Sequence, residues 1–269
     1  MNKRNLGFLA AFGATLIYGF NHTIAKNVMP TYIEPFGFIF LRVLGASLLF
    51  WTLSLFFKGK SIEKKDWPRL VLCSFLGMVI NMLAFFKGLE LSTPVNSSVL
   101  ITLAPILVFI FSALILKEKI RVMKAVGIIA GFIGALVLIL YTAKSGMNAP
   151  NIPLGNSLFI LNSASYGLYL VLIKPMIAKY DIITLLKWLF TIGFLLNLPI
   201  TYNDFSNINF TTLPLYEAIL PIVYVVVGTT FFYLLVKCLC IKKLNSFLGK
   251  FIYLLTTYSR NCLCNWNKK

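Results

Sequence analysis

Polar side chains that could bind a solute recur inside the long apolar segments of this chain. An uncharged polar residue within such a segment usually faces the interior of a helix bundle, because exposure to hydrocarbon is costly. Around one cavity, amides, hydroxyls and an imidazole would hydrogen-bond a small polar molecule. The alternative is that each one only joins neighbouring helices, at about 0.6 kcal/mol per contact. The candidates for the cavity are Tyr18, Asn21, His22, Asn81, Asn96, Ser97, Asn162, Tyr166, Tyr169 and Tyr224.

Two ionised residues, Arg42 and Glu90, also lie within the apolar segments. A charge inside a membrane helix is usually paired with an opposite charge or faces a functional site. Arg42 has two interpretations, a structural ion pair with Glu90 or Glu34, or attraction of an anionic group on a substrate. His22, the single histidine, titrates near neutral pH and suits proton coupling. Its alternative role is that of a packed imidazole.

The chain lacks the residue patterns of an enzyme or a metal protein. It has no paired carboxylates in the apolar segments and no glycine-rich phosphate loop, and one histidine cannot form a zinc site. The pairs Cys238-x-Cys240 and Cys262-x-Cys264 lie in a polar tail, where we attribute the spacing to chance. We therefore expect no catalytic activity, no metal and no cofactor. Any transport would be driven by a gradient or by exchange.

The composition is that of a helical membrane protein. Hydrophobic residues make up 59% of the 269 residues and charged residues only 12%, whereas soluble domains carry about 25% charge. Apolar runs of about 20 residues, long enough to cross a bilayer as helices, recur along the chain. The predicted spans are 6–29, 35–57, 69–89, 95–116, 122–141, 154–175, 182–200 and 215–236.

The formal charge of +17 fits a membrane location. Lysine and arginine cluster at the ends of apolar runs and in every second link, where they set topology and contact anionic headgroups. The expected partners are therefore the lipid bilayer and a small-molecule substrate, and not nucleic acid. By the positive-inside rule, the N-terminus and every second link are cytoplasmic.

The beginning of the chain is repeated further along. Eight residue types recur 148 positions later without a gap. The aligned pairs are Leu6-Gly7 with Leu154-Gly155, Tyr18-Gly19 with Tyr166-Gly167, Lys26 with Lys174, Tyr32 with Tyr180, Gly45 with Gly193, and Leu48 with Leu196. Because five spans separate the two starts, the second copy enters the membrane from the opposite side. Such inverted repeats are common among secondary transporters, which expose a midplane site to each side in turn.

Several short motifs add a family resemblance. They are Pro35-Phe36-Gly37-Phe38 to Leu41-Arg42, Ala84 to Glu90, Ser97 to Pro105, Leu116-Lys117-Glu118-Lys119, and Gly127 to Gly131. In order and spacing they resemble the EamA-type carriers of the drug/metabolite transporter superfamily. The resemblance implies an all-α polytopic fold of two inverted five-helix repeats, residues 1–143 and 154–236, joined by an outer linker, 144–153. It also implies a carrier in the bacterial inner membrane that exports small metabolites by alternating access.

The resemblance fails at the C-terminus. Family members have two further helices in the second repeat, but residues 237–269 form an atypical polar tail. We therefore expect an incomplete second repeat and about eight to nine spans. The alternative function is an inactive remnant with a scaffold role, because loss of the last helices would open the second half. Gly127 and Gly131 allow close helix approach, either within the bundle or in a homodimer.

Overall fold

The computed structural model describes residues 21, 24–29, 31–57, 59–116, 127, 130, 133–134, 137, 149–211 and 213–233. These residues form helices joined by short connections, and no strand occurs among them. The predicted spans 6–29 and 122–141 lie largely outside the described residues, and the tail 237–269 lies wholly outside them.

Six of the described helical stretches are long and apolar enough to cross a membrane. They are Pro35–Leu55, Lys64–Leu91, Pro94–Ile115, Ile152–Lys179, Ile182–Ser206 and Leu215–Phe232. Each overlaps one of the six spans predicted for this part of the chain. The expectation of an all-α, multi-pass membrane protein is confirmed, and the span count of the whole chain stays a prediction.

Several of these stretches are built from more than one helical element. The elements in chain order are α2 (Pro35–Leu55), η1 (Lys64–Asp66), α3 (Trp67–Ser74), the π-helical η2 (Phe75–Ile80), α4 (Asn81–Leu91), α5 (Pro94–Ile101), α6 (Ala104–Leu116), α8 (Ile152–Lys179), α9 (Ile182–Ser206), the π-helical η3 (Leu215–Ile219), α10 (Leu220–Val223) and the π-helical η4 (Tyr224–Phe232).

Local sequence explains where these helices begin and break. Proline occupies the first turn of α2, α5 and α8, where its missing N–H leaves no hydrogen bond unmade. The side chains of Thr93 and Asn151 cap α5 and α8 by accepting hydrogen bonds from backbone N–H groups of the first turn. The break between α5 and α6 directly precedes Pro105, whose nitrogen cannot donate to the carbonyl of Ile101.

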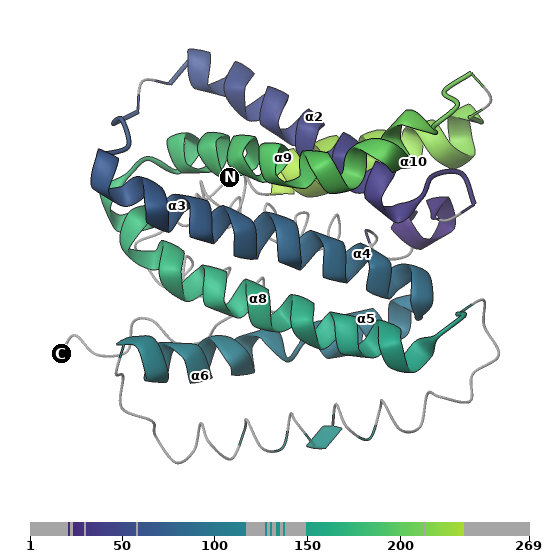
Figure 1. Cartoon of the computed structure of the whole chain (residues 1–269), viewed down its shortest axis with the longest axis horizontal. Helices are drawn as coiled ribbons and strands as arrows, with labels where there is room; N and C mark the ends of the chain where they lie inside the picture. Colours follow the sequence, from purple (N-terminus) through teal and green to yellow (C-terminus); the bar gives the residue numbers. More distant parts are fainter. Residues whose placement is uncertain are drawn as a thin grey trace, which may run out of the picture.

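Helices α2 and α9 pack along their length and run antiparallel (Figure 1). Phe40, in the first half of α2, stacks on Phe205 at the end of α9, with ring centroids 4.0 Å apart. Trp51, near the end of α2, meets Trp188 near the start of α9 at 5.6 Å. The starts of α2 and α9 therefore lie at opposite ends of this helix pair.

Helices α4 and α8 also pack side by side, and α6 contacts α8 as well (Figure 1). A β-carbon on Gly155 would lie 2.9 Å from the carbonyl oxygen of Gly88, and one on Gly88 would lie 3.0 Å from that of Gly155. The two backbones can approach this closely only because neither residue has a side chain.

Two further glycine contacts recur at the spacing of the sequence repeat. A β-carbon on Gly45 would lie 2.5 Å from the side chain of Val226, and one on Gly193 would lie 2.7 Å from Met78. Gly193 lies 148 positions after Gly45, and Val226 lies 148 positions after Met78. Met78 and Val226 lie in the π-helical segments η2 and η4.

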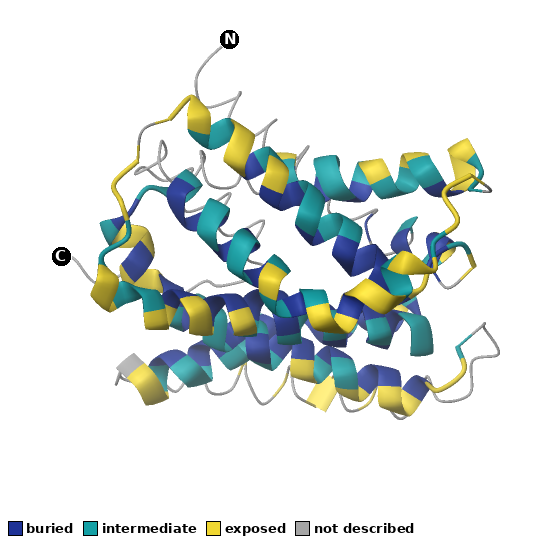
Figure 2. Cartoon of the chain, turned by 45° about the horizontal axis from the view of Figure 1, so that its top comes forward, coloured by how far each residue is buried: buried dark blue, intermediate teal, exposed yellow. Residues whose placement is uncertain are grey.

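Burial separates an inner from an outer surface. The bundle interior holds fully buried aromatic residues, including Phe38, Phe50, Phe86, Phe159 and Phe190. Large apolar side chains are also exposed, such as Leu48, Leu55 and Leu195, and exposed positions run along the outer faces of the helices (Figure 2). An apolar exterior of this kind suits contact with lipid.

Candidate functional site

A cavity of about 50 Å³ lies inside the helix bundle. This volume has room for a few water molecules or one small polar group. The lining residues are Asn21, Arg42, Asn81, Met82, Phe85, Phe86, Ile101 and Asn162. The structure thus brings four of the candidate residues together, namely Asn21, Arg42, Asn81 and Asn162.

The lining comes from segments far apart in the sequence. Arg42 lies on α2, Asn162 on α8, and Ile101 ends α5. Asn81 is the first residue of α4, directly after the π-helical segment η2. A π-helical turn holds an extra residue and so changes the face on which the next residues lie, and such turns are frequent at functional sites.

Asn81 and Asn162 connect α4 to α8 at the cavity wall. The amide nitrogen of Asn81 donates to the backbone oxygen of Asn162 at 3.2 Å. The amide nitrogen of Asn162 donates to the backbone oxygen of Asn81 at 2.7 Å. Each bond uses one of the two N–H donors of its amide, so the other N–H and the side-chain oxygen of each residue are left to bind a ligand.

Two adjacent threonines of η4 bind the other polar residues of the cavity. The Nε atom of Arg42 donates to the hydroxyl of Thr230 at 2.8 Å, and the Arg42 guanidinium lies 5.4 Å from the centre of the Phe86 ring. The hydroxyl of Thr229 donates to the side-chain oxygen of Asn21 at 3.0 Å. Arg42 and Asn21 are therefore oriented by the same segment.

The apolar residues of the lining cannot be recognised as site residues from their type alone. Met82, Phe85 and Phe86 would be assigned to the core in any apolar helix. Their spacing does place them near the site, because Phe85 follows Asn81 by one helical turn and Phe86 follows Met82 likewise.

Asn96 and Ser97 lie away from the cavity lining. The amide of Asn96 donates to Ser92 and to the side-chain oxygen of Asn156, both at 3.2 Å, and the Ser97 hydroxyl donates to the Pro94 carbonyl. These contacts join α5 and the end of α4 to α8, so the bonds of Asn96 match the helix-adhesion interpretation.

The described tyrosine candidates, Tyr166, Tyr169 and Tyr224, are not among the lining residues either. Tyr166 and Tyr169 contact each other with ring centroids 5.5 Å apart, and Tyr169 packs where a β-carbon on Gly77 would stand. Tyr224 is half-buried on η4. Tyr18 and His22 lie outside the described residues, so their placement in a cavity stays a prediction.

Glu90 forms an ion pair with Lys87, one turn away, at 2.7 Å. The two interpretations of Arg42, a structural ion pair or attraction of an anionic group, stay predictions. The Nζ atom of Lys26 donates to the backbone oxygens of Leu89 and Glu90, both at 2.8 Å. The contacts of Glu90, Lys87 and Lys26 therefore lie together at the C-terminal end of α4. Arg42 bonds Thr230 and lines the cavity.

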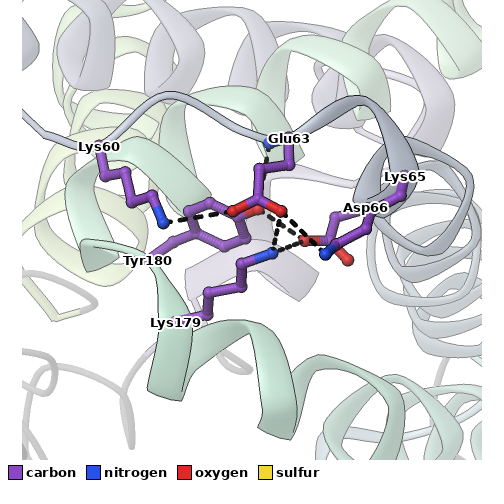
Figure 3. Close-up of polar contacts among 6 residues, drawn as sticks. All are labelled: Lys60, Glu63, Lys65, Asp66, Lys179 and Tyr180. Atoms are coloured by element: carbon purple, nitrogen blue, oxygen red, sulfur yellow. Dashed lines mark hydrogen bonds and ion pairs between the residues drawn. The ribbon is translucent and has the colours of Figure 1, made fainter.

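A polar cluster joins the link before α3 to the end of α8 (Figure 3). We call it the Tyr180 cluster, and its members are Lys60, Glu63, Lys65, Asp66, Lys179 and Tyr180. The Tyr180 hydroxyl donates to Asp66 at 2.6 Å and accepts from the backbone N–H of Glu63 at 3.0 Å. Lys179 lies 2.6 Å from carboxylate oxygens of both acidic residues.

Charge in this cluster strongly favours the ionised form of Glu63. Hydrogen bonds from Lys179, then Lys65 and Lys60, lower the pKa of Glu63 from 4.5 to about 2. In the sequence, the lysines of this link indicate only the topology of the membrane spans. The acidic members could have been noticed as the only carboxylates among these lysines.

A related contact lies at the other end of the α2–α9 pair. The Tyr32 hydroxyl, just before α2, donates to the carboxylate of Glu217 in η3. This bond raises the pKa of Tyr32. Tyr32 and Tyr180 are aligned residues of the sequence repeat, and each binds an acidic residue at the start of another membrane-spanning stretch.

Comparison with known proteins assigns the chain to a family. The profile of the EamA-like transporter family matches residues 5–140. The chain belongs to this family. The EamA resemblance predicted from the motifs is thereby confirmed.

Relatives of this EamA protein are named as transporters. An uncharacterized transporter of Archaeoglobus fulgidus is 31% identical over 57% of this chain and 52% of its own length. The uncharacterized transporters YetK and YoaV of Bacillus subtilis are 27% and 30% identical, over 78% and 69% of this chain and 64% and 63% of their own lengths. The chain thus spans about half to two thirds of these relatives.

One solved crystal structure shares the fold of this EamA protein. It matches with a TM-score of 0.56 at 17% sequence identity, over 96% of this chain and 86% of the other. At this identity the likeness concerns the fold alone. The family and the six apolar helices together establish a multi-pass membrane protein.

Proposed function

We propose that this EamA-family protein is a secondary transporter that moves a small metabolite out of the cell by alternating access. The observation that carries the proposal is the cavity, because Arg42 and the asparagines Asn21, Asn81 and Asn162 line it together. A polar cavity inside an apolar bundle is costly unless it binds something. Asn162 belongs to the proposed second repeat and the other three to the first, so the site lies between the halves, where transporters of this kind bind substrate.

Two contacts support an inverted arrangement of the halves 1–143 and 154–236, with 144–153 as their linker. The antiparallel course of α2 and α9 is what inversion requires of corresponding helices. Gly45 corresponds in the repeat to Gly193, and Val226 corresponds to Met78, so the contact Gly45–Val226 maps onto the contact Gly193–Met78. A two-fold relation between the halves accounts for both.

The two tyrosine contacts are suited to act as alternating gates. The Tyr180 cluster and the Tyr32–Glu217 bond join the two proposed halves at opposite ends of the α2–α9 pair. Rocking one half against the other would break one contact while it keeps the other. Each opening would then connect the cavity to one side of the membrane.

The basic residues support a cytoplasmic location for the Tyr180 cluster. Lys60, Lys64, Lys65, Arg69 and Lys179 all lie at that end, which the positive-inside rule assigns to the cytoplasm together with the N-terminus. We place the protein in the bacterial inner membrane on this basis and on that of its family. Outward transport follows the family resemblance.

Two further parts of the proposal concern regions described little or not at all. Pairing of two copies is proposed along Gly127 and Gly131. Gly131 lies outside the described residues, and a β-carbon on Gly127 would meet nothing within 4 Å. The alternative of an inactive remnant depends on the tail 237–269. The polar cavity favours the carrier, because a scaffold has no need of it.

The test locks each gate in turn. In a variant whose five cysteines are replaced by serine, Asn162→Cys reports access to the cavity. Cysteine pairs at Tyr180/Asp66 or at Tyr32/Glu217 then cross-link one end. We expect a membrane-impermeant maleimide to label Asn162→Cys only from outside when the first pair is locked, and only from inside when the second is. Labelling of Asn162→Cys from the same side whichever pair is cross-linked would contradict alternating access.

A further inference from the structure

The cavity wall carries a positive charge. Arg42 stays protonated at any physiological pH. The other lining residues are three asparagines and four apolar side chains, so the described part of the lining contains no acidic residue. An electric field in a low-dielectric bundle is screened less than in water, and this cavity will therefore attract anions.

Nearby lysines are occupied with structural contacts outside the cavity. Lys87 pairs with Glu90 at 2.7 Å, and Lys26 donates to two backbone oxygens at the end of α4. Lys187 lies over the ring of Trp51, 4.4 Å from its centre. None of the three lines the cavity, so Arg42 is the cationic residue in the part of the lining that the structure describes.

The polar groups beside Arg42 suit a small planar anion. The Thr229 hydroxyl lies 3.0 Å from the side-chain oxygen of Asn21, and the Asn21 amide nitrogen has two N–H groups that can donate to a ligand. The bond from Arg42 Nε to Thr230 fixes the plane of the guanidinium, whose fork matches the two oxygens of a carboxylate. A volume of about 50 Å³ admits a carboxylate head group, and Met82, Phe85 and Phe86 provide apolar surface for a carbon chain.

We infer that the cavity binds organic monoanions through an ionised carboxylate held by Arg42 and the amide of Asn21. The inference rests on the proposed role of the cavity as the substrate site and specifies its substrate class. Among the described lining residues Arg42 is the single charged one, which favours a carboxylate over a phosphate dianion.

The test is a binding measurement that needs no transport. Purified full-length protein in detergent is titrated with sodium butyrate or with its neutral analogue butyramide at constant ionic strength, and the thermal midpoint is recorded. A ligand that binds only the folded state raises the midpoint. We expect butyrate to act at a concentration about tenfold or more below butyramide, and Arg42→Gln to abolish the difference.

Two variants keep this test decisive. Arg42→Lys retains the charge without the fork and should bind butyrate with intermediate strength, which also covers the case that Arg42→Gln does not fold. Lys187→Gln removes the same charge outside the cavity and should leave the preference for butyrate unchanged. Equal effects of butyrate, butyramide and chloride, or a preference that Arg42 variants do not change, would overturn the inference.

The outcome is separable from that of the proposed function. If the gates alternate but the protein does not bind butyrate more tightly than butyramide, the protein transports another class of solute. Only this inference then fails. If butyrate binds through Arg42 but the locked gates do not change access to Asn162→Cys, the site stands and transport fails.

Discussion

Asn81 and Asn162 show how single residues can both hold helices together and shape a cavity. Each donates to the backbone oxygen of the other, across α4 and α8. A hydrogen bond between membrane helices contributes about 0.6 kcal/mol on average. The bonds are therefore weak as adhesion, and the larger role we propose for these residues is to offer the second N–H of each amide to a bound solute.

We predict that Asn81→Ala and Asn162→Ala each lower the free energy of unfolding by only about 0.6 kcal/mol. Each should weaken the binding of butyrate by a larger free energy than this loss of stability. Stability is measured by denaturant unfolding in mixed micelles. Ser157→Ala is the matched control, because Ser157 lies on the same helix and bonds within it to Pro153. Equal effects of all three substitutions on binding would assign the asparagines to adhesion only.

A second residue-scale prediction concerns pH. The pKa of Glu63 is lowered from 4.5 to about 2 by Lys179, Lys65 and Lys60. A depressed carboxyl pKa stabilises the folded protein fully above the ordinary value, and the contribution is lost as pH falls through about 2. The thermal midpoint of Glu63→Gln should thus be lower than that of the wild type at neutral pH, and the gap should shrink as pH falls below 4.5.

The measurement is a pair of melting curves across that pH range. Glu63 is half-exposed, so we expect the gap to narrow also at high salt, which screens surface pairs. A gap that stays constant from neutral to acid pH would show that the charge of Glu63 does not stabilise the cluster.

At the scale of elements, the contact between α4 and α8 depends on missing side chains. A methyl group on Gly155 would lie 2.6 Å from the Ser92 β-carbon and 2.9 Å from the Gly88 carbonyl oxygen. Gly155→Ala must therefore separate the helices, which we expect to destabilise the protein by about 1–3 kcal/mol. Because the same helices carry Asn81 and Asn162, butyrate binding should weaken too.

Ser157→Ala is the control for this substitution. Ser157 lies two residues further along α8, is exposed, and bonds within its own helix to Pro153. Unfolding titrations should therefore show little loss of stability for Ser157→Ala. An unchanged stability for Gly155→Ala would mean that α4 and α8 can move apart at no cost.

For the whole molecule, the proposed inverted repeat predicts the side of the membrane on which each connecting segment lies. The segments that follow α2 and α9 should emerge on opposite faces of the membrane, because these helices run antiparallel. In the cysteine-free variant, Lys60→Cys should react with an impermeant maleimide only from the cytoplasmic side, and Asn209→Cys only from outside. Both native residues are exposed. Labelling of both from one side would rule out inversion.

The sequence located part of the site and the structure selected among its candidates. Polar residues in apolar segments drew attention to Asn21, Arg42, Asn81 and Asn162, which share one cavity. The same criterion also drew attention to Asn96, which bonds Ser92 and Asn156 instead. Residue type cannot separate the two roles, because a buried amide needs partners in either case.

The sequence by itself determined the class of the protein, since apolar runs long enough to cross a bilayer must form helices to satisfy their backbone groups. It also determined the family and the spacing of the repeat. Only the tertiary structure decided which polar groups meet, that Glu90 pairs with Lys87, and that Tyr32 and Tyr180 bind carboxylates. These contacts join residues 185 and 114 positions apart, and they exist only because helix packing, which hydropathy does not encode, brings those ends together.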